Sequence, residues 1–280
     1  DSVAGTTYRI NDAKIAVDSK NVPHILYLKN TYTYYPGNLV GLDSISHAKK
    51  AGSGWSIDDI FAGFNPFEGY DLKNLNYDFD SQDKLHITVW TTNFLEMLYI
   101  SQISGFAAQG IEVELSPPNH FRPHRAHNPS IALDSQDTPH IAFSYAGCLV
   151  FGLIHAKKDA NNWKGEIINT DYCPYPPSTI FGRGYDPYIA IDKLHDFNNI
   201  HFVYRFCATG DKDCYIGYSK TDQNSIPPSS GLALEPYWPG NNNQFGQPLS
   251  IAEIAVDSHN NAHIVYTIQK TVLKYTAICC

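Results

Sequence analysis

The sequence predicts an all-β protein built from five similar units, on three observations. The stretch Ile131–Tyr145 recurs four more times, each time as an apolar run, an aspartate, a short polar turn and a second apolar run that begins at histidine. The runs alternate apolar with small or polar residues at the two-residue period of a strand, and none has the spacing of a helix. The anchoring aspartates are separated by 62, 54, 58 and 65 residues and are Asp18, Asp80, Asp134, Asp192 and Asp257. Repeats of this length indicate radial repetition of a small sheet.

Each unit holds four predicted strands. The first ends at the aspartate and the second begins at the histidine, while a third run ends near a lysine pair, as in residues 45–50 and 153–158. After a further turn, a fourth run opens with tryptophan, at Trp55 and Trp163. Four antiparallel strands make one blade, so the sequence predicts a five-bladed β-propeller. The predicted blades cover residues 13–61, 75–115, 128–169, 187–238 and 252–278.

The two ends of the chain predict how the ring closes. The fifth unit stops after its third strand, and residues 4–10 precede the first unit. We expect this N-terminal strand to supply the fourth strand of the fifth blade, because that pairing would remove an open sheet edge. The chain has 280 residues, of which 43% are hydrophobic. That is enough for a full core, so we expect a single propeller domain over residues 1–280.

Composition excludes some classes of partner. The formal net charge is -8 with only 20 lysines and arginines. This balance argues against a nucleic-acid-binding protein or one that binds an anionic membrane surface, because both need a large basic face. No run of 18 apolar residues is present, so no transmembrane helix is predicted. The chain begins at Asp1 rather than at methionine, which fits a processed, secreted protein.

The cysteines predict an oxidising compartment. All six lie in the second half of the chain without the paired spacing of a metal site, at Cys148, Cys173, Cys207, Cys214, Cys279 and Cys280. We predict a disulfide between Cys207 and Cys214, because they flank one short turn. We also predict one between Cys148 and Cys173, because the turn that holds Cys148 and the connector that holds Cys173 should lie on the same face of a propeller. Such bridges imply a secreted or extracellular location. The alternative is buried, reduced cysteines, and for the C-terminal pair a vicinal bridge, an intermolecular bond and free thiols stay open.

The repeat resembles a known family. The unit Ile-Ala-x-Asp-Ser … Pro-His-Ile-x-Tyr, followed by a lysine-rich third strand and a tryptophan-led fourth, is similar to the sialidase-like (BNR-like) repeats of secreted bacterial propellers over most of the chain. The resemblance implies the propeller fold. Such repeats occur in sialidases, in lectin-like modules and in surface proteins, so they do not specify an activity. The Ser-x-Asp-x-Gly-x-x-Trp box of sialidases is not found in clean form.

The repeated aspartates and histidines are expected to stabilise the blades. The histidines stand at the start of each second strand, at His24, His86, His140, His201 and His263. Groups present in every unit more often build the unit than bind a ligand. We therefore expect an aspartate-capped turn and a histidine hydrogen-bonded across the hairpin, and no metal or cofactor.

Differences between the units predict a binding site. Four residues after the repeat histidine, two copies carry Trp90 and Arg205, whereas the other three carry leucine, serine or threonine. The connector 119–128 concentrates basic residues in a protein that is acidic overall. Rings and guanidinium groups suit a sugar and its carboxylate or sulfate. The predicted ligand-binding residues are Trp90, Arg122, His124, Arg125, His127, Arg183, Tyr185, Asp186 and Arg205. The alternatives are blade packing, a polar loop, and a zinc site on the connector's histidines, which its prolines disfavour.

Three functions follow from this pattern. The first is a secreted, non-catalytic propeller that binds a glycan or another cell-surface partner through its loop-rich face. The second is a glycoside hydrolase of sialidase-like or arabinanase-like type, which needs two carboxylates about 5 to 10 Å apart. The candidate acids are Asp12, Glu68, Asp71, Asp78 and Asp186. Arabinanase-type propellers place acids at the starts of inner strands, which Asp12 and Asp186 match, but the repeats here are more regular than in that family. The third is a surface protein that self-assembles. We expect the first, and no catalytic residue.

Overall fold

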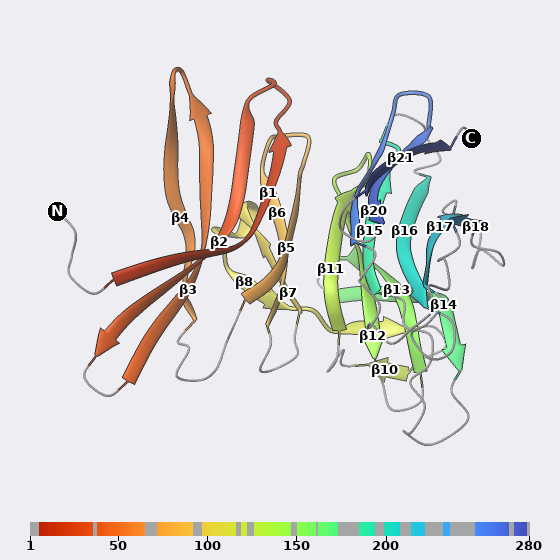
Figure 1. Ribbon diagram of the computed structural model, residues 1–280, viewed down its shortest axis with the longest axis horizontal. Coiled ribbons are helices and arrows are strands. Elements are labelled where there is room, and N and C mark those ends of the chain that lie inside the picture. Colours follow the sequence, from red (N-terminus) through yellow and green to blue (C-terminus); the bar gives the residue numbers. More distant parts are fainter. Residues whose placement is uncertain are drawn as a thin grey trace. The chain divides into compact units, whose positions relative to one another are not determined.

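The computed structural model describes fourteen stretches of the chain, and Figure 1 shows their strands. They are residues 6–35, 38–64, 72–91, 97–115, 119–121, 126–146, 150–160, 162–172, 185–193, 199–207, 214–221, 232–235, 250–268 and 272–278. The chain divides into two compact units, Asp1–Ile111 and Glu112–Cys280, and each is described by itself. The expected single domain over residues 1–280 stays a prediction.

The first unit contains two antiparallel sheets of four strands, each in simple up-and-down order. The first sheet consists of β1 (Thr6–Val17), β2 (Pro23–Tyr35), β3 (Asn38–Ala51) and β4 (Gly54–Phe64). The second consists of β5 (Leu72–Phe79), β6 (Leu85–Thr91), β7 (Met97–Ser101) and β8 (Ala108–Gly110). A 3-10 turn, η2 (Gln102–Ser104), joins β7 to β8. The sheets pack face to face, with Leu26, Leu28 and Ile45 buried against Leu72 and Ile87.

The second unit contains three sheets. The third sheet of the protein has β11 (Ala126–Leu133), β12 (Pro139–Ala146), β13 (Val150–Asp159) and β14 (Asn162–Tyr172), and it is extended by β9 (Val113–Leu115) and β10 (Asn119–Phe121). The fourth has β15 (Tyr185–Ile191), β16 (Ile200–Cys207), β17 (Cys214–Thr221) and β18 (Leu232–Glu235). The fifth has β19 (Ser250–Val256), β20 (Ala262–Ile268) and β21 (Val272–Ile278). Buried apolar side chains join the third sheet to the fourth and the fourth to the fifth.

This architecture confirms the predicted class, an all-β protein of five antiparallel sheets that forms a five-bladed β-propeller. The strands follow the repeat: β1, β5, β11, β15 and β19 are the first strands, and each leads through the aspartate turn into the second. Within the described residues no helix is long and apolar enough to cross a membrane.

Two details of the prediction need correction. Thr6–Ile10 belongs to β1 and pairs with Lys29–Thr33 of β2, so this segment lengthens the first hairpin and does not complete the fifth blade. Residues 4 and 5 of the predicted strand lie outside the described residues. A partner one hairpin away costs less loop-closure entropy than one at the far end of the chain. The predicted second blade also ran too far, because Val113–Leu115 pairs in parallel with Trp163–Gly165 of the third sheet. In the described residues the fifth sheet has three strands.

Every first strand carries a register irregularity near its beginning. The pairing shifts between Ile10 and Asp12 in β1, and at the corresponding places in β5, β11, β15 and β19. We call this the bulge place. A bulge leaves residues unpaired and redirects their side chains, and such irregularities are common beside active sites.

Candidate functional site

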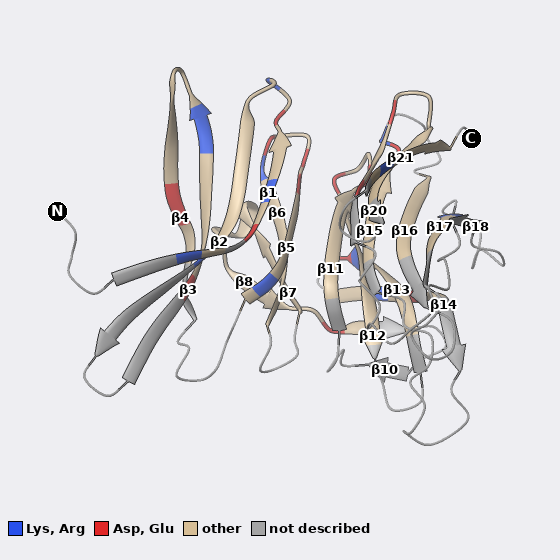
Figure 2. Ribbon diagram, viewed as in Figure 1, with Lys and Arg blue, Asp and Glu red and all other residues tan. Residues whose placement is uncertain are grey.

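The end of each sheet where the first strand passes into the second, here the turn end, is built around the repeat aspartate. In the first sheet, Asp18 Oδ1 accepts hydrogen bonds from the backbone amides of Lys20 and Val22, both at 2.9 Å. Asn21, between them, has φ 60°, the left-handed conformation that asparagine and aspartate tolerate. Asp80, Asp134 and Asp257 close their turns in the same way. Figure 2 shows acidic residues at these turns.

The second carboxylate oxygen holds the repeat histidine. His24 Nε2 lies 3.1 Å from Asp18 Oδ2, and His24 Nδ1 lies 2.7 Å from His47 Nε2 on the third strand. The third sheet repeats this contact between two histidines. In the second, fourth and fifth sheets a tyrosine hydroxyl on the third strand contacts the repeat histidine in place of the second histidine, from Tyr99, Tyr218 and Tyr275. The predicted role of the histidines within the blade is confirmed. The described residues contain no group of three side chains suited to hold a metal ion.

Some turns also reach the neighbouring sheet of the same unit. Asp83 of the second sheet accepts hydrogen bonds from the Ser19 amide and hydroxyl, both at 2.8 Å, and these bonds lower the pKa of Asp83. In the fourth sheet the turn is longer, and His201 Nε2 contacts Asn260 Oδ1 of the fifth sheet at 2.8 Å. Asn260 and Asp83 occupy the same left-handed place in their turns. The turn ends therefore link successive sheets as well as closing hairpins.

The third sheet extends its chain of contacts by one carboxylate. His140 lies 3.2 Å from Asp134 and 2.9 Å from His155, and His155 Nδ1 lies 2.8 Å from Glu166 Oε1. Burial lowers the pKa of His140 to about 4.

Asp134 stays ionised within this chain. Burial alone would raise its pKa, but hydrogen bonds from His140 and from the amides of Thr138 and Gln136 outweigh burial and hold the pKa well below its usual range. Lys157 adds an ion pair, with Nζ 3.2 Å from Asp134 Oδ2. The turn end is thus a saturated polar network, whose members serve the blade.

The opposite end of each sheet, here the loop end, contains the predicted ligand-binding residues. In the second unit, His127 lies at the start of β11, and Tyr185 and Asp186 begin β15. Arg205 stands opposite Tyr185 in the register of β15 and β16. Because β11 and β15 are adjacent, joined by a 3.2 Å hydrogen bond from the Ile189 amide to Ser130 Oγ, the backbone brings these four predicted residues to one end of two neighbouring sheets.

The other predictions are distributed differently. Trp90 is partly buried on β6 of the first unit, opposite Lys73 and Met97. Cys207 and Cys214 face one another as the last pair of β16 and β17, within the Cα separation of a disulfide for directly opposed strand residues. Their bridge stays a prediction. The remaining predicted residues lie outside the described part of the chain and are Arg122, His124, Arg125, Arg183, Cys148 and Cys173.

The bulge place holds polar residues that the sequence interpretation did not connect. Aligning the copies on the turn aspartate puts Asp12, Asn74, Asn128 and Asp186 at the same position, six residues before it, with Ile251 in the fifth copy. Asn74 and Asn128 have φ 55° and 54°. Asp12 Oδ2 accepts a 2.8 Å hydrogen bond from the Leu75 amide. The signal that would have found this set is the recurring aspartate or asparagine at a fixed distance from the turn.

Comparisons with known proteins identify the fold. No family model and no curated protein sequence matches the chain. Among solved structures, the Penicillium chrysogenum alpha-L-arabinanase complexed with arabinobiose is 14% identical, with a TM-score of 0.53 over 97% of this chain and 81% of that one. The Bacteroides thetaiotaomicron endo-arabinase is 12% identical, with a TM-score of 0.48 over 97% and 94% of the two chains. The likeness to the Penicillium protein shows a shared five-bladed β-propeller fold, and the propeller implied by the repeat resemblance is supported without its sialidase-like specificity.

Proposed function

We propose that the protein is a carbohydrate-active propeller that hydrolyses a polysaccharide through residues at the loop end of its sheets. The observation that carries the proposal is the bulge place: Asp12 is the first residue paired after the irregularity of β1, and Asp186 lies within the irregularity of β15, between Tyr185 and Tyr188. Arabinan is the first substrate to test, because one solved structure with a likeness in fold is an arabinanase complexed with arabinobiose. This proposal replaces the non-catalytic function as the main hypothesis.

Asp12 has the features of a positioned carboxylate. Its Oδ2 is fixed by the Leu75 amide at 2.8 Å. Within the described part of the chain no hydrogen bond to its Oδ1 is found, so that oxygen can accept a proton or hold a water molecule. Hydrolysis of a glycosidic bond uses one carboxyl group as acid and another as base or nucleophile. Asp12 in the first unit and Asp186 in the second are each a candidate for one of these roles, and each is tested by itself.

Substrate contacts are proposed for the loop end of the second unit. Tyr185 and Arg205 are cross-strand neighbours there, and His127 lies on the adjacent sheet. A ring packs against the CH face of a sugar, and a guanidinium group donates to its oxygens. We also propose a secreted or extracellular location, which the predicted disulfides require.

The test is hydrolysis of arabinan, galactan and fructan by the full chain, measured as release of reducing ends. Asp12→Asn and Asp186→Asn should each lower the rate by about 100-fold or more, the size expected for a lost acid or base. Asp58→Asn, which changes an exposed carboxylate on β4, is the control and should leave the rate unchanged. In Asp12→Asn the carboxamide oxygen can still accept the hydrogen bond from the Leu75 amide, so folding should be preserved.

Binding without hydrolysis would support the lectin-like alternative. Affinity electrophoresis in gels that contain each polysaccharide measures binding separately from turnover. A polysaccharide that retards wild type but is never cleaved would overturn the hydrolase. If the protein neither binds nor cleaves any of the three polysaccharides, that result would overturn the carbohydrate-active function itself for these substrates.

A further inference from the structure

The turn end of the fifth sheet carries a chain of three polar side chains. His263 Nε2 lies 3.0 Å from Asp257 Oδ2, and His263 Nδ1 lies 2.6 Å from the Tyr275 hydroxyl. Asp257 directly follows β19, whereas His263 lies on β20 and Tyr275 on β21. The three strands of this sheet thus bring together a carboxylate, an imidazole and a hydroxyl, in that order.

Asp257 is held in place by its own turn. Its Oδ1 accepts hydrogen bonds from the amides of His259 and Asn261, and its Oδ2 accepts one from the Asn261 carboxamide, all at 2.9 Å. Hydrogen bonds from Asn261 and His263 hold the pKa of Asp257 well below its usual range, so the carboxylate is ionised. An ionised carboxylate only accepts hydrogen bonds, so His263 Nε2 carries a hydrogen. In the neutral ring Nδ1 is then the acceptor, and the Tyr275 hydroxyl donates to it.

The second and fourth sheets contain the same contact between histidine and tyrosine. His86 Nδ1 lies 2.6 Å from the Tyr99 hydroxyl, and His201 Nδ1 lies 2.8 Å from the Tyr218 hydroxyl. These contacts are buried, and the two tyrosines are 4% and 7% exposed. Because the contact recurs, we attribute it to the blade. In the fifth sheet, however, the contact is exposed and Tyr275 is 62% exposed, so a reagent can reach this hydroxyl.

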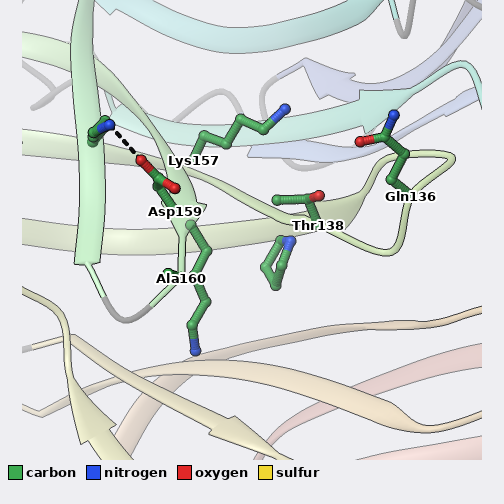
Figure 3. Close-up of a pocket in the computed structure, with 8 residues that line it drawn as sticks. Gln136, Thr138, Lys157, Asp159 and Ala160 are labelled. Atoms are coloured by element: carbon green, nitrogen blue, oxygen red, sulfur yellow. Dashed lines mark ion pairs between the residues drawn. The ribbon is translucent and has the colours of Figure 1, made fainter.

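The turn end of the third sheet presents different chemistry. A pocket of about 540 Å³ lies there, and Figure 3 shows Gln136, Thr138, Lys157 and Asp159 around it. Asp159 forms an ion pair with Lys164. The described lining includes the hydroxyl of Thr138 but no histidine that could take its proton. The hydroxyl with a positioned base is therefore the one on the fifth sheet.

A hydroxyl held by an imidazole that a carboxylate orients is the arrangement that activates a nucleophile. We propose that Tyr275 is a nucleophile activated by His263 and Asp257, and that activated carboxylic esters acylate it. The phenol oxygen forms a bond to the acyl carbon, and the bond from that carbon to the leaving oxygen breaks. The leaving group departs as its anion, while the phenol proton passes to His263 Nδ1 and then to solvent. The product is an O-acyl tyrosine.

The test treats the full chain with p-nitrophenyl acetate at about pH 8, above the ordinary pKa of histidine. Peptide mass spectrometry follows the acetylation of each tyrosine with time. Transfer is favourable because p-nitrophenol is a stronger acid than the tyrosine phenol. Tyr275 should react about tenfold or more faster in the folded chain than in the chain unfolded in urea, because a positioned base removes its proton. Tyr99 and Tyr218 have the same histidine contact but are buried, so they should react more slowly when folded.

His263→Gln should remove this advantage, so that Tyr275 of the folded variant reacts at the rate of the unfolded chain. The matched control is His259→Gln, which removes an imidazole of the same turn whose Nδ1 lies 3.5 Å from Ser258 Oγ. This control should leave the rate at Tyr275 unchanged. Circular dichroism verifies that each variant folds. If His263→Gln does not fold, the comparison of folded and unfolded wild type decides.

The proposal would be overturned if Tyr275 is not acetylated, or if it reacts equally fast in the folded and the unfolded chain. An unchanged rate in folded His263→Gln, or an equal loss in His259→Gln, would overturn it as well. Acetylation that is unaltered in Asp12→Asn separates this site from the proposed hydrolysis, since the site uses neither Asp12 nor Asp186.

Discussion

Acidification should weaken the second unit through His140, the buried imidazole between Asp134 and His155. Its side chain is 1% exposed, and burial lowers its pKa from 6.5 to about 4. In the unfolded chain the same histidine titrates near its ordinary value. Protons therefore bind the unfolded state more tightly, so the stability that neutral His140 contributes is complete above about pH 6.5 and is lost as the pH falls toward the folded pKa.

The size of the effect follows from the two pKa values. A full shift of this extent corresponds to about 3 kcal/mol, and about 2 kcal/mol of it should be lost by about pH 5. Asp134 does not oppose the trend in this window, because its pKa is held well below its usual range and it stays ionised. Lys157 Nζ lies 3.2 Å from Asp134 Oδ2. The change between the two pH values is thus assigned to His140.

Urea unfolding followed by circular dichroism at about pH 7.5 and about pH 5 measures the effect. His140→Gln removes the titration but keeps a donor for Asp134, so this variant should be less stable at neutral pH and lose about 2 kcal/mol less on acidification than wild type. Histidines that do not contact His140 are common to both proteins and cancel in the difference, whereas His155, at 2.9 Å, is coupled to His140 and is counted with it. Equal losses in wild type and variant would show that His140 does not carry the pH dependence.

Three further experiments test the packing and the covalent structure. Gly217→Ala should cost about 1 to 3 kcal/mol in unfolding free energy, because a methyl group there would lie 2.7 Å from the Tyr204 ring; Tyr204→Leu in the same chain should recover part of the loss. Ser130→Ala leaves a buried amide of β15 without its acceptor and should cost about 1 to 3 kcal/mol in the same assay. Peptide mass spectrometry without reduction should find Cys207 joined to Cys214, and free thiols at both would refute the bridge.

The repeat was predictable because its residues act locally. Asp18 and His24 are six residues apart and meet across a single turn, so their spacing alone indicates the hairpin and the hydrogen bonds that close it. The two-residue alternation in Ile131–Tyr145 likewise fixes strand type and the buried face. Five copies of such a unit leave few alternatives to a propeller.

Features that depend on competition between partners were not predictable. Nothing in Thr6–Ile10 distinguishes an extended first hairpin from an added strand on the fifth sheet, since both pairings satisfy the same backbone groups. The parallel contact of β9 with β14 is non-local in the same sense. For the candidate site, Tyr185 and Arg205 lie opposite one another because β15 and β16 form the antiparallel pair that the repeat predicts. Arg122 and Arg125 lie outside the described residues.

The contact between Asn260 and His201 has a consequence for engineering and for the evolution of the repeat. A histidine of one sheet obtains its acceptor from a turn residue encoded almost sixty positions later, and Ser19 depends in the same manner on Asp83. A unit excised and inserted elsewhere, or duplicated in tandem, would arrive with polar atoms matched to a neighbour it no longer has. A unit cut just after Asn260 keeps His201 with its acceptor, 59 residues away. Ser19 and Asp83 are 64 residues apart, more than the 62 residues between Asp18 and Asp80, so a transferred single unit always loses that contact.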